Sequence, residues 1–170
     1  SDGRGVDLRQ SALYTMMPFI AMTVCCLVGG WWSDRLSRAK GPYIGRCVFA
    51  AVSLIATAGF LVVGAHAADP FIASVTLAGG AGALYLGQSS YWAVTANYAG
   101  PHTGIVSGMI NMGAQIAGAI TATLTPWIAQ NYGWEIAFYV AAALAVVCGL
   151  AWFLVNPGNR LNEEREEVQA

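Results

Sequence analysis

Long apolar runs separated by short polar breaks organise this chain. Each run is near twenty residues, which is the length that a helix needs to cross a hydrocarbon layer of ~30 Å. The runs cover residues of about 11–32, 43–65, 71–98, 104–129 and 135–155. This pattern predicts an all-α membrane protein with five transmembrane helices.

The ends of the runs carry residues that interrupt helices. These interruptions are Gly41-Pro42, Asp69-Pro70, Gly100-Pro101 and Asn156-Pro157-Gly158. Two further prolines, Pro18 and Pro126, fall inside runs. A proline removes one backbone hydrogen bond and bends a helix, so each is either a structural kink or a hinge for a rocking motion.

Composition supports a membrane protein. Hydrophobic residues make up 56% of the 170 residues and charged residues only 10%, whereas soluble domains carry roughly 25% charged residues. Between Asp69 and Glu135 there is no Asp, Glu, Lys or Arg. The net charge of -1 and the placement of the few cations in loops argue against nucleic acid as a partner.

The sequence offers no metal or disulfide framework. All four cysteines lie inside apolar runs, and the two histidines are not at ligand spacing, so we expect no metal and no other cofactor. The first eleven residues carry charges of both signs and do not resemble a signal peptide. Because the chain also lacks an initiator Met, we expect it to be a fragment of a longer polypeptide.

The charged segment after the first run predicts the orientation. Residues 33–42 contain Asp34, Arg35, Arg38 and Lys40 and follow two tryptophans. Tryptophan favours the headgroup region, and cytoplasmic loops retain Lys and Arg, so this segment is expected to be a cytoplasmic loop of a multi-pass protein in the cell (inner or plasma) membrane. An odd number of crossings then places residues 1–10 outside, although they hold Arg4 and Arg9. The domains expected are a partial transmembrane half-domain at 1–159 and a charged cytoplasmic tail at 160–170.

Polar side chains gather on one face of the third and fourth runs. The third carries Tyr85, Gln88, Ser89, Trp92 and Thr95, spaced at three or four, and the fourth carries Ser107, Asn111 and Gln115 at intervals of four. An amide at membrane depth costs free energy unless it is paired. These side chains therefore either line a water-filled cavity or form hydrogen bonds between helices at roughly 0.6–2 kcal/mol each.

Glycines are frequent in the same two runs. They are Gly79, Gly80, Gly82 and Gly87 in the third run and Gly104, Gly108, Gly113 and Gly118 in the fourth. Such residues let helix backbones approach closely and slide. We therefore expect these two helices to line the cavity and to move when it opens.

Two stretches resemble the major facilitator superfamily. The charged segment matches its Gly-x-x-x-Asp-Arg-x-x-Arg loop signature through Gly30, Asp34, Arg35 and Arg38. The run from Pro101 to Gly118, followed by Thr125-Pro126 and by residues 133–139, resembles the eleventh and twelfth helices of the anion:cation symporter branch, which carries sugar acids and other organic anions. The resemblance covers nearly the whole chain and implies helices 8–12 of a twelve-helix fold.

The resemblance also implies roles for individual residues. Ser89 and Trp92 match ligand-facing positions on the tenth helix, and Asn111 matches one on the eleventh, whereas Tyr85, Gln88 and Gln115 are added from helical spacing alone. Asp34 is expected to dock at a helix N-terminus in the missing N-terminal half, where the helix dipole favours a negative charge. The arginine that holds the substrate carboxylate and the acidic proton carrier are also expected in that half.

The sequence therefore favours a secondary active transporter that moves a small organic anion, such as a sugar acid, with a coupling proton by alternating access. Its expected partners are that anion, the proton, membrane lipid and the missing half. The alternative is a truncated or degenerate half that acts as a membrane interaction module. An enzyme is not expected, because His66 and His102 lie at opposite surfaces and no acid–base pair can assemble.

Overall fold

The structure is a computed structural model that describes residues 8–67 and 69–155, with side chains from Tyr14 onward. All regular elements in this part of the chain are helical. They are α1 (Leu8–Lys40), the π-helix η1 (Tyr43–Val48), α2 (Phe49–Ala65), α3 (Pro70–Leu86), α4 (Gln88–Ala99), the 3-10 turn η2 (Gly100–His102), α5 (Thr103–Tyr132) and α6 (Trp134–Trp152). The expected tail at 160–170 and most of the expected outer segment lie outside the described residues.

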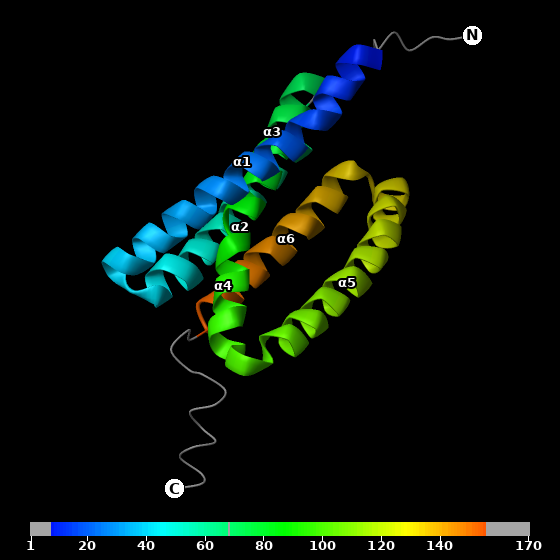
Figure 1. Ribbon diagram of the computed structural model, residues 1–170. Coiled ribbons are helices and arrows are strands. Elements are labelled where there is room, and N and C mark those ends of the chain that lie inside the picture. The colour runs from blue at the N-terminus through cyan, green and yellow to red at the C-terminus, as the bar shows by residue number, and fades with distance from the viewer. Residues whose placement is uncertain (1–7, 68, 156–170) are drawn as a thin grey trace, which may run out of the picture.

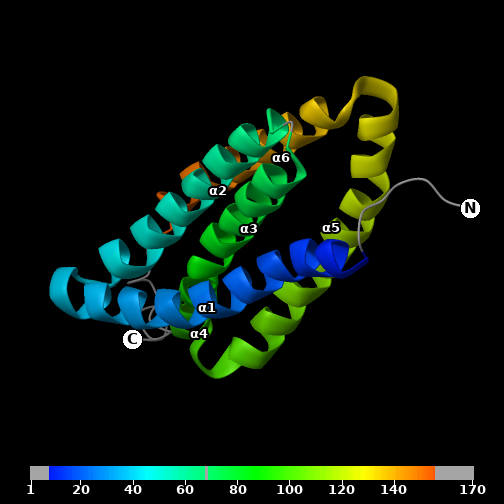
Figure 2. The ribbon, with the colours of Figure 1, turned by 90° about the horizontal axis from the view of Figure 1, so that it is seen from above.

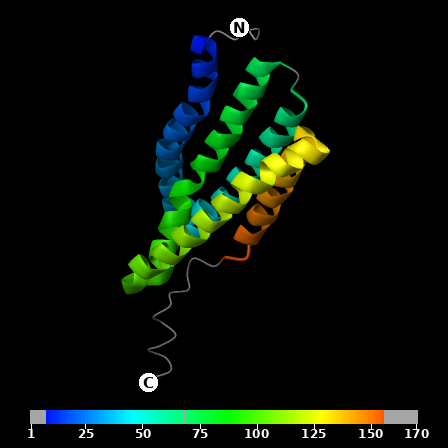
Figure 3. The ribbon, with the colours of Figure 1, turned by 90° about the vertical axis from the view of Figure 1, so that its right-hand side faces the viewer.

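The helices form a packed group with one outlying member. Helix α3 lies between α1 and α2, and α6 packs against α2 on its other side (Figures 1 and 2). Helix α4 continues the course of α3, and the chain reverses at η2. Helix α5 then runs back alone, and α6 returns beside α2 (Figure 3). Helix α5 touches α4 near one end and α6 near the other, so its middle stands away from the group.

Length and apolar composition identify four helical stretches that can cross a membrane. These stretches are Tyr14–Lys40, Tyr43–Ala65, Pro70–Tyr132 and Trp134–Trp152. The third has 63 residues and reverses direction at η2, so it consists of two antiparallel legs. The all-helical architecture with several long apolar helices is that of a multi-pass membrane protein.

The charged segment is not the loop that we expected. Helix α1 continues without a break to Lys40 and is 33 residues, or roughly 50 Å, long. The segment contains good helix formers, and Arg38 and Lys40 in the last turn interact favourably with the helix dipole. The helix ends at Gly41, whose φ of 91° is open to glycine and strained for other residues, and the following Pro42 limits its continuation.

At two further places, both at a glycine, the structure differs from the continuous α-helices that the sequence predicted. The second run starts as a π-helix rather than an α-helix, and its Gly45 lies so close to the Ser37 backbone that a Cβ there would overlap Ser37. The third run is divided at Gly87, whose missing side chain leaves room for Ser53 of α2 at 3.2 Å from the position of a Cβ. Both irregular positions therefore coincide with close contacts: Gly45 contacts the backbone of α1, and Gly87 contacts a side chain of α2.

The reversals at the opposite end have clear local causes. Helix α3 begins at Pro70, and the Asp69 carboxylate accepts a hydrogen bond from the Phe71 backbone N–H at 2.7 Å as its N-cap. Helix α5 continues to Tyr132, beyond the expected end at 129, and Gly133, with a φ of 96°, reverses the chain into α6. Pro18 and Pro126 lie inside α1 and α5.

Close packing through glycine occurs between α1 and α3. A Cβ at Gly29 would overlap the Leu86 carbonyl, and one at Gly82 would lie 3.0 Å from the Cys25 sulfur. The glycines of α5, by contrast, have no atom of another element near them in the described part of the chain. Nothing from a neighbouring helix lies within 4 Å of the place that a Cβ would take at Gly104, Gly108, Gly113 or Gly118.

We expect Gly29→Ala to destabilise the protein by about 1–3 kcal/mol, because the added methyl group forces α1 and α3 apart. The midpoint of thermal unfolding in detergent measures this loss. Gly59→Ala is the matched control, since Gly59 is helical and has nothing within 4 Å of its Cβ position. Equal midpoints for the two variants would contradict the close approach of α1 and α3.

Candidate functional site

Two buried serines connect three helices beside the charged segment. The Ser33 hydroxyl of α1 donates to the Gly45 carbonyl of η1 at 2.7 Å, and its oxygen lies 2.9 Å from the Ser90 hydroxyl of α4. Both side chains are buried, with exposed fractions of 2% and 0%. Hydrogen bonds between membrane helices stabilise their packing, so this cluster fixes the charged end of α1 to η1 and α4.

Next to this cluster, two residues that were selected separately from the sequence, Gly30 and Ser89, lie close together. Gly30 belongs to the charged motif and Ser89 to the polar face of the third run, and a Cβ at Gly30 would lie 3.6 Å from that of Ser89. The Ser89 hydroxyl is buried and has no hydrogen-bond partner among the described residues. Ser89 therefore packs against α1.

Sequence reasoning missed Ser33 and Ser90 as a pair. Ser33 lies inside the motif stretch, three residues after Gly30, and Ser90 follows directly on Ser89. Their relation depends on the lateral register of α1 against α4, which spacing along one helix does not contain. The sequence did contain one indication of this pair: Ser33 directly precedes Asp34 of the charged motif, and Ser90 directly follows the predicted site residue Ser89.

The charged motif itself is exposed. The Arg35 guanidinium lies 5.7 Å from the centre of the Trp31 ring, a cation–π contact, and Arg38 Nε donates to the Asp34 backbone carbonyl at 3.3 Å. Within the described part of the chain the Asp34 carboxylate makes no hydrogen bond and no ion pair. Asp34 and Arg35 are exposed and Arg38 lies near the end of the helix, so their charges remain accessible to another segment.

An arginine connects η1 to α4. Arg46 of η1 donates from Nη1 to the Ala93 carbonyl of α4 at 3.4 Å, and its buried Nε has no partner among the described residues. A charged side chain costs free energy where it is poorly solvated, and the hydrogen bond to Ala93 offsets part of this cost. Arg46 therefore adds a polar contact at the junction between η1 and α4.

The remaining predicted side chains do not form one cluster. Tyr85 and Gln88 are half-buried, the latter at the start of α4, whereas the Trp92 side chain is 40% exposed. Asn111 and Gln115 are exposed on α5. No hydrogen bond joins these five side chains to one another in the structure as described, so the interhelical pairing considered above is not formed here.

Helix α5 has two distinct faces. One is polar or small along its length, at spacings of three and four: Gly104, Ser107, Gly108, Asn111, Gln115 and Gly118. The other is apolar and forms a groove of about 610 Å³ lined by Ile116, Ala119, Ile120, Thr123, Leu124 and Trp127. The apolar face suits lipid, whereas the polar face suits water or another protein segment.

Comparison with known proteins identifies the family. The model of the Major Facilitator Superfamily matches residues 1–169. The chain belongs to the Major Facilitator Superfamily. This family consists of transporters and not enzymes, which confirms the expectation that the chain is not an enzyme.

Individual superfamily members resemble the chain over most of its length. It is 30% identical to a probable sulfoacetate transporter of Cupriavidus necator over 160 residues, which are 92% of this chain and 37% of that protein. A hexuronate transporter of Bacillus subtilis is 30% identical, with 88% of this chain and 37% of the relative covered. A galacturonate transporter of Dickeya chrysanthemi is 26% identical, with coverages of 93% and 43%. The chain thus spans less than half the length of these curated relatives.

The cluster of Ser33 and Ser90 joins the end of α1 that carries the charged motif to α4, the helix that carries Trp92. Within the described residues, no group of three or more His, Cys, Asp or Glu side chains is placed to hold a metal ion. The polar groups described here are hydroxyl, amide and indole groups, together with the Arg46 cation.

We expect Ser33 and Ser90 to be energetically coupled. In a double-mutant cycle of Ser33→Ala and Ser90→Ala, the coupling in the free energy of unfolding should be about 0.6–1.7 kcal/mol, the range for hydrogen bonds between membrane helices. Denaturant titration in mixed micelles measures it. Ser33→Ala with Ser74→Ala is the control pair, because the Ser74 hydroxyl donates to its own helix, at the Pro70 carbonyl. Equal coupling in both cycles would exclude the contact.

Proposed function

We propose that this chain is the C-terminal part of a secondary active transporter that moves small organic anions, such as sugar acids, together with protons. Its membership of the superfamily and the named substrates of its relatives, sulfoacetate, hexuronate and galacturonate, support this proposal. In such a transporter the substrate binds near the bilayer midplane between two halves, which rock to expose it to one side at a time.

The proposed topology has five crossings that correspond to helices 8–12 of a twelve-helix fold. They are α1, then η1 with α2, then α3 with α4, then α5 and α6. The C-terminal ends of α1, α4 and α6 lie toward one end of the molecule, whereas those of α2 and α5 lie toward the other (Figure 1). Five crossings in alternating directions would give this arrangement.

The proposed orientation follows from charge. Three cations, Arg35, Arg38 and Lys40, lie in the last turns of α1, at the end that we assign to the cytoplasm. The start of α1 then lies outside, and the end of α6 inside, in the plasma or inner membrane.

The observation that carries the function is the uncovered polar face of α5. Asn111 and Gln115 are exposed in the middle of a helix that is long and apolar enough to cross a membrane. A primary amide has two donors and a carbonyl acceptor, and it is costly in hydrocarbon when these are unpaired. The same groups match the hydroxyl and carboxylate groups of a sugar acid. We therefore assign Asn111 and Gln115 to substrate binding.

The half-buried and exposed groups of α3 and α4 complete the proposed site. Trp92 offers a ring face and an indole N–H, and Tyr85, Gln88 and Ser89 lie on the same two helices. The substrate charge is balanced by groups of the remaining part of the transporter, which is the proposed partner of this chain.

The charged motif is assigned to the conformational change. Asp34 is exposed and without an ion pair in the described part of the chain, and we propose that it docks at a helix N-terminus of the other half. The serine cluster links this contact to α4. Movement of α1 relative to the other half is thereby transmitted to the helix that carries Trp92.

Asn111→Ala and Trp92→Ala should each reduce transport by about tenfold or more in kcat/KM, the effect of losing ~1.4 kcal/mol of transition-state stabilisation. The assay is uptake of labelled galacturonate into proteoliposomes, driven by an imposed pH gradient, with the longest natural polypeptide that contains this chain.

Variants on the apolar face of α5 provide the controls for this assay. Thr123 and Trp127 line the apolar groove. The variants Thr123→Ala and Trp127→Phe should therefore retain wild-type uptake. Wild-type uptake by Asn111→Ala together with Trp92→Ala would remove both residues from the proposed mechanism.

The topology makes a separate prediction. In a variant without its native cysteines, Lys40→Cys should react with a membrane-impermeant maleimide only after cells are permeabilised, whereas His66→Cys should react in intact cells. Both native side chains are exposed at helix ends, so access to water decides the result. Labelling of Lys40→Cys in intact cells would reverse the proposed orientation.

A further inference from the structure

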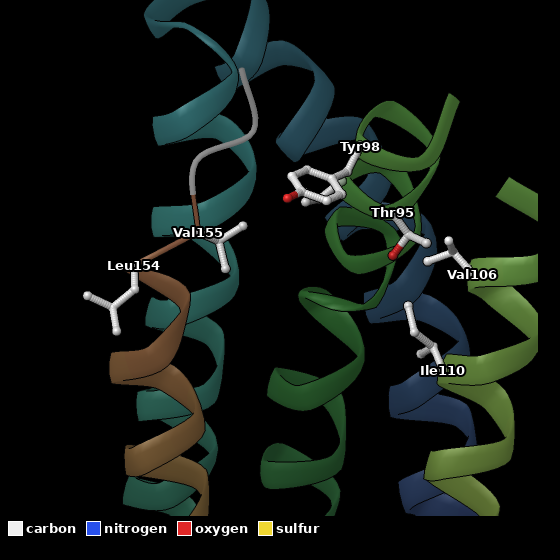
Figure 4. Close-up of a pocket in the computed structure, with 7 residues that line it drawn as sticks. Thr95, Tyr98, Val106, Ile110, Leu154 and Val155 are labelled. Carbon is white, nitrogen blue, oxygen red and sulfur yellow. The ribbon is translucent and has the colours of Figure 1, made fainter. Parts of the chain in front are cut away.

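A second candidate binding site lies where α5 leaves α4. It is a cavity of about 420 Å³, within the range of small-molecule sites (Figure 4). Helix α4 contributes Val94, Thr95 and Tyr98, helix α5 contributes Val106 and Ile110, and Leu154 and Val155, which follow α6, border it on the third side. Three segments of the chain therefore border one cavity, which is open on one side because the Leu154 side chain is 87% exposed.

The chemistry of the lining is apolar with two hydroxyl groups. The Thr95 hydroxyl donates to the Tyr91 carbonyl at 2.8 Å, so its oxygen remains able to accept a hydrogen bond. The Tyr98 hydroxyl makes no hydrogen bond to another described residue, and its side chain is 39% exposed. It can donate and accept. The other described lining residues are aliphatic and uncharged.

The cavity differs from the proposed transport site. Ile110 and Asn111 are adjacent in sequence and thus about 100° apart around α5. Figure 4 shows the Val106 and Ile110 side chains on the α5 side of the cavity, near Thr95, whereas the Tyr98 ring points from α4 toward Val155, which follows α6. An apolar ligand in this cavity would contact α5 in a region where α4 is the main packing neighbour of α5 among the described elements.

We propose that this cavity binds an uncharged single-chain amphiphile of the monoacylglycerol type. The hydrocarbon chain packs against Val94, Val106 and Ile110, and the ester and hydroxyl groups form hydrogen bonds with Tyr98 and Thr95. Among the described lining residues the polar groups are hydroxyls and none is a cation, so this part of the lining suits an uncharged headgroup better than a phosphate. Such a ligand enters from the membrane and bridges α4, α5 and the end of α6.

Photolabelling tests the site directly. The purified protein in nanodiscs is irradiated with a monoacylglycerol that carries a diazirine in its chain, and the labelled peptides are identified by mass spectrometry. We expect labels on the segments around Tyr98 and Ile110, which unlabelled monoacylglycerol displaces and phosphatidylglycerol does not.

Two variants make the assignment specific. Ile110→Trp fills the cavity and should abolish this labelling, whereas Ile120→Trp, on the apolar groove of the same helix, should not. Tyr98→Phe keeps the shape and removes the hydroxyl group, so it should weaken displacement by unlabelled monoacylglycerol by roughly threefold to tenfold, as expected for one hydrogen bond.

Each other outcome overturns the proposal. Unchanged labelling in Ile110→Trp excludes the cavity as the site, and equal displacement by phosphatidylglycerol assigns the cavity to bulk lipid. Labels spread evenly over exposed apolar side chains such as Leu27 and Val63 indicate an unspecific lipid surface. Monodisperse elution and an unchanged unfolding midpoint establish that each variant is folded, and Tyr98→Phe tests the site without altering its volume.

Discussion

An unpaired amide against hydrocarbon costs free energy, and this cost limits what can cover helix α5. Helix α5 is long and apolar enough to cross a membrane, yet Asn111 and Gln115 are exposed on it, in line with a row of glycines. The apolar groove is on a different face. Lipid can cover only that apolar face, so the polar face requires water, a ligand or another protein segment. This requirement supports the proposed binding site on α5.

The packing of the described helices divides the chain into a fixed part and an outlying helix. Helices α1, α2, α3 and α6 pack in close contact, and Gly29 and Gly82 allow α1 and α3 to approach each other. The serine cluster of Ser33 and Ser90 adds a polar connection from α1 to α4. Helix α5 is joined to this group near its ends only. An element with few packed neighbours moves at low cost, which is what the proposed opening of the cavity requires of α5.

Hydropathy predicted the helical class because apolar length is a local property of the sequence. The end of α1 was predicted wrongly, since charge marks where a chain meets water and does not by itself end a helix; Gly41 does that. The π-helix around Gly45 and the break at Gly87 lie where these glycines come close to Ser37 and Ser53 on other helices, and such contacts are not visible in the spacing along one helix. For the same reason, spacing along one helix identified the polar residues of α5 but did not reveal that Ser89 packs against Gly30.

The surroundings of residue 111 can be measured by the reaction of a cysteine at this position with a small water-soluble thiol reagent in the membrane-embedded protein. In a background without native cysteines, we expect Asn111→Cys to react much faster than Ile120→Cys, on the apolar face, and galacturonate to slow the first reaction only. Equal, slow reaction at both positions would place residue 111 in lipid and exclude a water-accessible polar face on α5.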